Sequence, residues 1–178
     1  PSQSIPSSVI NLAAGQTFDD QGSGAAAGSG RNISNGTFNN AGTYTKSAGA
    51  DYTYISALFN NTGTLNANSG TVRLAGGGTS SGAFYVAALS TLTFEGGVHN
   101  LTGGSLQNLG TLSFAGGTNT IGAGVAYSGG GAINVSGGTT SSQIGSSISG
   151  GALTLSGGTL RLAGDLSTPT LTMSGGTL

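Results

Sequence analysis

The sequence predicts an all-β fold, a parallel β-helix (solenoid) with coils of about 20 residues and three short strands per coil. Two observations lead to this prediction. A phrase of the type apolar, polar, apolar, small, Gly, Gly recurs along the chain, and residues 152–158 write it as A-L-T-L-S-G-G. Its first apolar residue stands at positions 72, 92, 112, 133, 153 and 171, so the steps are 20, 20, 21, 20 and 18 residues. Such a fixed period is typical of a solenoid in which each repeat forms one turn.

Two columns of apolar residues are expected to line the interior of the coil. Side chains alternate along a strand, so the first and third residues of the phrase face one way and the second faces the other. Stacked coils then place like residues above one another. The structural ladder is predicted to contain Val72, Leu74, Leu92, Phe94, Leu112, Phe114, Ile133, Val135, Leu153, Leu155, Leu171 and Met173. The opposite, polar face carries Arg73, Thr93, Ser113, Asn134, Thr154 and Thr172.

The glycines that close each phrase are predicted to form corners. Glycine accepts a positive φ, and a side chain at a corner would obstruct the adjacent coil. The first glycines of these corners are Gly76, Gly96, Gly116, Gly137, Gly157 and Gly175. More apolar residues follow each corner, such as Leu101 and Leu106, and predict the second and third strands. The hand is expected to be right, the default for parallel crossovers.

The chain divides into two regions. Residues 1–35 lack the phrase and are predicted to form an N-terminal cap or an irregular Gly/Ser/Ala segment, in which residues 9–12 and 17–18 could form short strands. Residues 36–178 are predicted to form the β-helix, regular from about residue 71. The Y-T-Y segment at 52–54 lies 20 residues before 72–74, so it is expected to continue the ladder. The last phrase runs to Leu178, where we expect an open end that further coils, a cap or another subunit would cover.

Charge and cysteine content exclude several classes of partner. The chain has only 4 Lys and Arg residues against 5 Asp and Glu residues, a net charge of −1. Because so few cationic side chains cannot neutralise a run of phosphates, no nucleic-acid partner is expected. No apolar run approaches the ~20 residues that cross a bilayer, so no transmembrane segment is expected. Cysteine is absent from the sequence, which excludes disulfides and thiolate metal sites.

One repeat resembles those of a known class of exported proteins. Residues 150–164, G-G-A-L-T-L-S-G-G-T-L-R-L-A-G, resemble the repeat of bacterial autotransporter passenger domains and of haemagglutinin-like adhesins. The segments N-T-G-T-L at 61–65 and N-L-G-T-L at 108–112 are similar to the openings of such repeats. The resemblance covers roughly residues 36–178. It implies a β-helical stalk, export to the cell surface or the medium, and adhesion or self-association.

The candidate catalytic groups are carboxylates. A β-helix that cleaves polysaccharides needs two or three acids together on one face of adjacent coils. The sequence supplies Asp19, Asp20, Asp51, Glu95 and Asp165. The neighbours of Glu95 in its column are alanines and serines, Asp19 and Asp20 point to opposite faces of a strand, and Arg73 is the expected partner of Glu95. We therefore predict no catalytic residue and no enzyme.

Metal and cofactor sites are not expected either. His99 is the only histidine, follows a Gly-Gly corner and is expected to be solvated. Without a second His, Cys or Asp nearby, it has no partner for a metal or a general-base role. The turns carry Gly, Ser, Thr and Asn instead of the repeated Asp of calcium-binding β-rolls.

Two further patterns carry alternative hypotheses. A threonine column, broken by Val98, invites an ice-binding hypothesis, although threonine is also simply a good strand residue. It contains Thr118, Thr139, Thr159 and Thr177. Six aromatic residues could stack on sugars or on a partner, although filling the core or covering an edge is the favoured interpretation. They are Tyr44, Tyr52, Tyr54, Phe84, Tyr85 and Tyr127.

The predicted function is that of a non-enzymatic structural or adhesive protein, extracellular or on a bacterial cell surface. It would be a stalk segment or a subunit of a self-assembling filament or matrix. The expected partners are further copies of the chain, further coils of a longer chain, or surface glycans. The alternative is a carbohydrate-binding or carbohydrate-cleaving β-helix, which requires two acids or several aromatic residues along one groove. An ice-binding solenoid is the third hypothesis.

Overall fold

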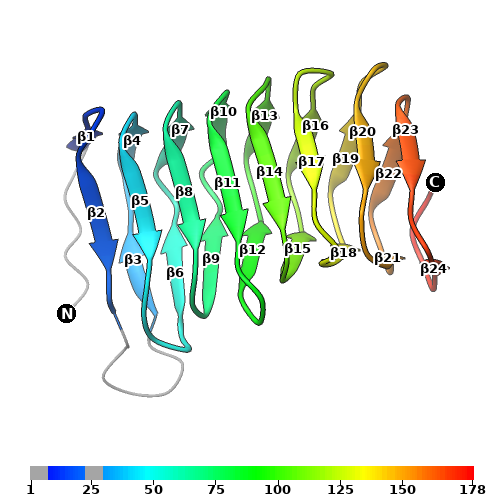
Figure 1. Ribbon diagram of the computed structural model, residues 1–178, viewed down its shortest axis with the longest axis horizontal. Coiled ribbons are helices and arrows are strands. Elements are labelled where there is room, and N and C mark those ends of the chain that lie inside the picture. The colour runs from blue at the N-terminus through cyan, green and yellow to red at the C-terminus, as the bar shows by residue number, and fades with distance from the viewer. Residues whose placement is uncertain (1–7, 23–29) are drawn as a thin grey trace.

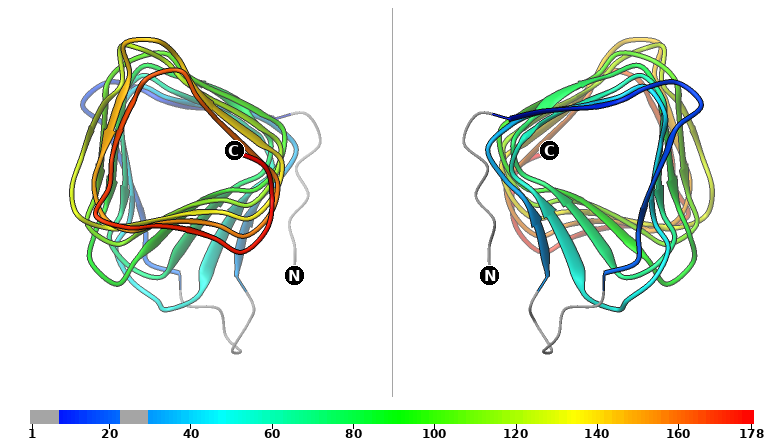
Figure 2. Two further views of the ribbon diagram at one scale, coloured as in Figure 1. Left: turned by 90° about the vertical axis from the view of Figure 1, so that its right-hand side faces the viewer. Right: turned by 90° about the vertical axis from the view of Figure 1, so that its left-hand side faces the viewer.

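The protein is a β-solenoid. The computed structural model describes residues 8–22 and 30–178, which form 24 strands and no helix. Three parallel sheets of eight strands make the walls of one rod (Figure 1). Seen along its axis, the rod has a roughly triangular section with one sheet on each side (Figure 2). The predicted parallel β-helix with three strands per coil is confirmed. Within these ranges there is no helix long and apolar enough to cross a membrane.

Every coil contributes one strand to each sheet, in the order A, B, C along the chain. Sheet A contains β1 (Ser8–Leu12), β4 (Gly36–Asn40), β7 (Leu58–Asn61), β10 (Gly78–Ser80), β13 (Val98–Leu101), β16 (Thr118–Ile121), β19 (Thr139–Ser142) and β22 (Thr159–Leu162). Sheet B contains β2 (Thr17–Asp20), β5 (Thr43–Lys46), β8 (Thr64–Ala67), β11 (Ala83–Val86), β14 (Ser105–Asn108), β17 (Ala126–Ser128), β20 (Ser147–Ser149) and β23 (Asp165–Ser167). Sheet C contains β3 (Arg31–Ile33), β6 (Tyr52–Ile55), β9 (Thr71–Leu74), β12 (Thr91–Phe94), β15 (Thr111–Phe114), β18 (Ala132–Val135), β21 (Leu153–Leu155) and β24 (Leu171–Met173).

The coil is right-handed. In Figure 1 the strands of sheet B run downward in front, and those of sheet A return upward behind, while the chain advances from left to right. Strands β1, β2 and β3 are the first strands of the three sheets, so residues 8–22 and 31–33 already belong to the rod. The predicted irregular segment falls partly on residues 23–29, which lie outside the described residues.

Sheet C carries the apolar ladder. Its strands pair in register, with Val72 opposite Leu92, Leu92 opposite Leu112, and so on to Leu171. All ladder residues between Val72 and Leu155 are buried. On β24, the outermost strand of the sheet, Leu171 is 41% and Met173 49% exposed.

The Y-T-Y segment does not continue this ladder, contrary to expectation. Val72 pairs with Thr53, and Leu74 pairs with Ile55. Thr53 and Ile55 are fully buried, so Tyr52 and Tyr54 face outward. The step from this coil to the next is therefore 19 residues, one fewer than the sequence period suggested. A shift of one residue moves every side chain of a strand to the other face.

The two glycines of each pair serve different purposes at the corner between sheets C and A. The second glycine has a positive φ, for example 69° at Gly117 and 65° at Gly138, where an L side chain is strained. The first glycine has no positive φ. A Cβ at Gly116 would instead collide with the carbonyl oxygen of Glu95 in the preceding coil. The corner glycines predicted from the sequence are of this first, sterically restricted type.

The interior is filled by aliphatic and aromatic side chains. Tyr44, Phe84 and Tyr127 lie inside, as the core interpretation of the aromatic residues predicted. Phe94 stacks on Phe114 in the next coil with 5.3 Å between ring centroids. A cavity in the apolar interior of the later coils, beside Phe114, measures only about 10 Å³. A void of this size is about the minimum for one water molecule.

Candidate functional site

A surface groove lies on the outer face of sheet C. It has a volume of about 470 Å³. The residues that line it are Gly30, Asn32, Tyr52, Tyr54, Arg73 and Glu95. Two aromatic rings, a cation, a carboxylate and an amide therefore meet on a wall that is otherwise made of small residues. We call this feature the tyrosine groove.

The tyrosine groove runs along the rod axis. Asn32 lies on β3, the tyrosines on β6, Arg73 on β9, and Glu95 directly follows β12. These four strands are consecutive neighbours in sheet C. Three strand spacings of ~4.8 Å give the groove a length of about 14 Å. The tyrosines stand two residues apart on one strand, which is why both face outward.

Arg73 connects the two tyrosine rings. Its guanidinium carbon lies 5.1 Å from the ring centroid of Tyr52 and 5.6 Å from that of Tyr54. These distances are within the range of cation–π attraction. Arg73 is the direct cross-strand neighbour of Tyr54, so the contact follows from the register. The rings are therefore held by a rigid sheet.

The predicted pair of Arg73 and Glu95 is present. The guanidinium donates from Nε to Glu95 Oε2 over 2.8 Å and from Nη2 to Oε1. The side chains are 35% and 28% exposed, so the pair is partly solvated. A solvated pair of this kind contributes about 0–1 kcal/mol to stability. Its consequence for the groove is a lining without net charge.

The carboxylates are not gathered in the tyrosine groove. Asp19 is exposed and Asp20 is fully buried, so the two point to opposite faces of β2 as expected. Asp165 lies on β23 in sheet B, and Asp51 immediately precedes β6. Among the residues that line the tyrosine groove, Glu95 is the one carboxylate, and it is paired with Arg73. The two-acid condition for polysaccharide cleavage is therefore not met by this lining.

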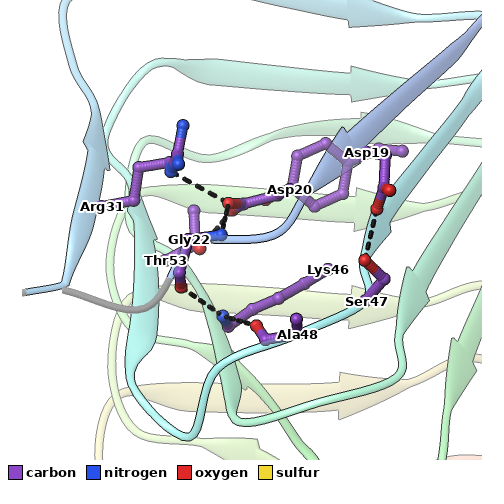
Figure 3. A network of polar contacts seen from close by, with 9 residues as sticks. Asp19, Asp20, Gly22, Arg31, Lys46, Ser47, Ala48 and Thr53 are labelled. Atoms are coloured by element: carbon purple, nitrogen blue, oxygen red, sulfur yellow. Dashed lines mark hydrogen bonds and ion pairs between the residues drawn. The ribbon is translucent and has the colours of Figure 1, made fainter.

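Asp20 is the centre of a buried polar network at the N-terminal end of the rod (Figure 3). Its Oδ1 lies 3.0 Å from Nε of Arg31 and accepts the backbone N–H of Gly22 over 3.0 Å. Its Oδ2 accepts the hydroxyl of Tyr44 over 2.9 Å and that of Thr53 over 2.5 Å. Arg31 and Gly22 of the first coil and Tyr44 and Thr53 of the second are thereby tied to one carboxylate.

Tyr44 is held as a hydrogen-bond donor in this network. Burial raises the pKa of its hydroxyl, and the negative charge of Asp20 raises it further. The phenol therefore stays protonated and donates to the carboxylate. The sequence pattern does not predict this network, because its members are far apart in the chain and meet only in the folded rod.

Lys46 is fully buried beside the network. It follows Asp20 in the same column of sheet B. Its Nζ donates to the carbonyl oxygen of Ala48 over 2.8 Å and to that of Gly22 over 3.3 Å (Figure 3). Both acceptors belong to chain segments that leave sheet B. The lysine thus fastens these segments to the interior and is not available to a ligand at the surface.

His99 is buried, which corrects the expectation of a solvated side chain. It faces inward on β13 and its ring packs edge-on against Phe94 with 5.0 Å between centroids. Its Nε2 has no hydrogen-bond partner among the described residues. Burial lowers the pKa of His99 below its ordinary value of 6.5, and hydrogen bonding to the backbone at Gly96 and Leu74 opposes this only in part. The imidazole is therefore neutral at pH 7.

Acid is expected to destabilise the protein through His99. Its folded pKa is lowered, so the unfolded chain binds the proton first. The stability contributed by the neutral imidazole is complete above about pH 6.5 and is lost as the pH falls below 6.5 towards the folded pKa. Thermal unfolding followed by circular dichroism between pH 7.5 and 5.5 checks this. The wild type should lose melting temperature, while His99→Leu should give a nearly flat profile. An equal slope in both proteins would contradict the assignment.

The asparagines of the N-x-G-T-L segments link neighbouring coils. Asn61 and Asn108 are buried, and so is Asn40 in the related segment N-A-G-T-Y at 40–44. The Nδ2 of Asn61 donates to the carbonyl oxygen of Ala83, and that of Asn108 to Ala132, each in the next coil. The motif therefore marks a corner that is fastened to its neighbour. Its position varies, since Asn61 ends a strand of sheet A and Asn108 a strand of sheet B.

The threonine column forms a regular row on the outer face of sheet A. Thr118, Thr139, Thr159 and Thr177 stand opposite one another in successive coils. A second outward column beside it contains Asn100, Thr120 and Ser141. This places hydroxyl groups two residues apart in β16 and β19, so the threonine column has a partner column in these strands. Measurement of thermal hysteresis would test the ice-binding hypothesis.

No group of three or more His, Cys, Asp or Glu side chains that could hold a metal ion occurs in residues 8–22 and 30–178. Comparisons with protein-family models, with curated proteins and with solved structures found no match.

Proposed function

We propose that the protein is a non-enzymatic structural or adhesive rod, either a stalk segment or a subunit of a self-assembling filament or matrix. One observation carries the proposal. Apart from the link between β2 and β3, the described strands follow one another through turns of two to five residues. Nearly all of the described residues thus form the rod itself. A partner can therefore contact only its outer faces or its ends.

The outer faces are suited to contact with uncharged surfaces and with further copies of the chain. Residues 96–160 contain no Asp, Glu, Lys or Arg. Threonine, serine, asparagine and glutamine take most of the outward strand positions there, so hydroxyl and amide groups are presented on each sheet. Val98, Leu109 and Ile144 are the large apolar side chains exposed in this stretch. A net charge of −1 gives little long-range repulsion between molecules, and proteins near neutrality tend to associate. Like-charged rows, which would oppose stacking, are absent from this stretch.

The proposed location is the bacterial cell surface or the extracellular medium. It is supported by the resemblance of residues 150–164 to repeats of exported adhesins and by a cysteine-free sequence, which needs no disulfide chemistry outside the cell. Fractionation of cells that produce the protein, followed by protease treatment of intact cells, tests this location. Recovery of the protein from the cytosol alone would contradict it.

Adhesion or self-association should be measurable and should depend on the lack of charge. We expect the purified protein to form rods or filaments in negative-stain electron micrographs and to be retained on glass or cultured cells. Replacement of Ser113 and Thr154 by glutamate places two negative charges on the outer face of sheet C, raises the net charge from −1 to about −3 and should weaken both properties severalfold. The matched control replaces the same two residues by glutamine, which is long and polar but neutral. A monodisperse monomer that binds neither itself nor any surface would refute the proposed function.

A further inference from the structure

We propose that the tyrosine groove binds a neutral, linear glycan that lies parallel to the rod axis. The proposal goes beyond the adhesive role, because a rod can adhere through its faces without a dedicated site. If the protein is also adhesive, a glycan bound in the groove would be a specific ligand for adhesion.

The aromatic part of the groove offers a stacking surface. Tyr52 and Tyr54 leave one strand on the same side, two residues or about 7 Å apart. They are only partly buried. Tyrosine combines a large apolar face with a polar hydroxyl, which suits the apolar C–H faces and the hydroxyl groups of a pyranose ring. Arg73 holds both rings before a ligand arrives, so the two side chains are already ordered for binding.

The polar part of the groove offers donors and acceptors side by side. The two bonds to Glu95 occupy two of the five N–H donors of the Arg73 guanidinium. The remaining donors and the second lone pairs of the carboxylate oxygens can pair with adjacent hydroxyl groups of a sugar. Asn32 adds an amide at the N-terminal end of the groove. This combination of donors and acceptors recognises hydroxyl groups and not a phosphate or a bare apolar chain.

The charge of the groove favours a neutral ligand. Arg73 and Glu95 compensate each other, and the other lining residues are uncharged. A uronic acid or sulfated sugar would have to approach Glu95 and compete with it for Arg73. That competition leaves one carboxylate unpaired, which opposes binding of acidic glycans.

The direction of the groove predicts the shape of the ligand. Its lining comes from four consecutive strands of sheet C, stacked along the rod. Neighbouring strands are ~4.8 Å apart, roughly the length of one pyranose unit in an extended chain. A linear glycan along the axis can therefore place about one sugar on each coil. The branch of a branched glycan would project out of the groove.

The proposal is tested by calorimetry with defined oligosaccharides. The neutral probes are cellohexaose, maltohexaose and chitohexaose, and the acidic probe is hexagalacturonic acid. We expect at least one neutral probe to bind, with affinity that rises from its disaccharide to its tetrasaccharide and then levels off. Tyr54→Ala and Tyr52→Ala should each weaken binding about tenfold. The matched control is Tyr85→Ala, because Tyr85 is also partly buried on an outer face but lies on β11 in sheet B.

Several outcomes would overturn the proposal. They are no binding of any neutral probe, binding of the acidic probe alone, equal losses in Tyr54→Ala and Tyr85→Ala, or an affinity that does not depend on chain length up to four sugars. If an alanine variant fails to fold, NMR titration of the wild type with the same probes decides the matter. The signals of Tyr52, Tyr54 and Arg73 must then shift, and those of Tyr85 must stay. A wild-type protein that adheres but binds none of the neutral probes would refute this site alone and leave the adhesive rod standing.

Discussion

Replacement of Asp20 by alanine is expected to lower the free energy of unfolding by about 3–5 kcal/mol. The substitution leaves the buried hydroxyls of Tyr44 and Thr53 without their acceptor and removes the partner of Arg31. Lys46, the neighbour of Asp20 in the same column of sheet B, is fully buried and stays next to the altered site. In a chain of this length such a loss corresponds to a melting temperature lowered by about 10 °C, measurable by circular dichroism.

The matched control for Asp20 is its neighbour in the sequence. Asp19 is exposed, on the outer side of β2, where its contacts are with Ser47 and Gln21. Asp19→Ala should therefore leave the melting temperature nearly unchanged. Equal effects of the two substitutions would show that the network does not stabilise the N-terminal coils. Arg31 is 51% exposed, so part of its charge can return to water when Asp20 is lost, and the lower end of the expected range allows for this.

Replacement of Gly116 by alanine is expected to cost about 1–3 kcal/mol, the usual penalty of overpacking. The added methyl group would meet the carbonyl oxygen of Glu95, a backbone atom that cannot rotate away. The corner of one coil would have to move away from the coil before it, and strand pairing beside the corner would weaken. Thermal or denaturant unfolding measures the change.

Two glycines serve as controls for this prediction. At Gly96, the equivalent position one coil earlier, a Cβ would lie 3.0 Å from the carbonyl oxygen of Ala75, so Gly96→Ala should cost less than Gly116→Ala. At Gly130 a Cβ would meet nothing within 4 Å. Gly130→Ala should leave stability unchanged or raise it by about 0.4–1 kcal/mol, because it restricts the unfolded chain. A larger loss at Gly130 than at Gly116 would contradict the steric explanation.

Only part of the tyrosine groove can be predicted from the sequence. The pair of Arg73 and Glu95 follows from the 20-residue repeat, because the repeat places Thr93 beside Arg73 and Glu95 two residues further along the same outer face. A constant 20-residue period predicts that Tyr52 and Tyr54 face inward. The coil between Thr53 and Val72 is one residue shorter, and this single residue turns both rings to the surface. Irregular coils are thus where sequence periodicity places side chains on the wrong face.

The sequence by itself determined the β-helix, the apolar ladder of sheet C and the glycine corners. These features depend on the alternation of side chains along a strand and on a repeat that brings equivalent residues together. The alternation and the repeat are both visible in the sequence. Only the tertiary structure decided which polar residues lie inside. Asp20 and Lys46 share an inward-facing column of sheet B, where hydrogen-bond partners meet them. His99 faces inward in sheet A and packs against the ring of Phe94. Residue type alone would place all three at the surface, since burial of such groups depends on neighbours that are distant in sequence.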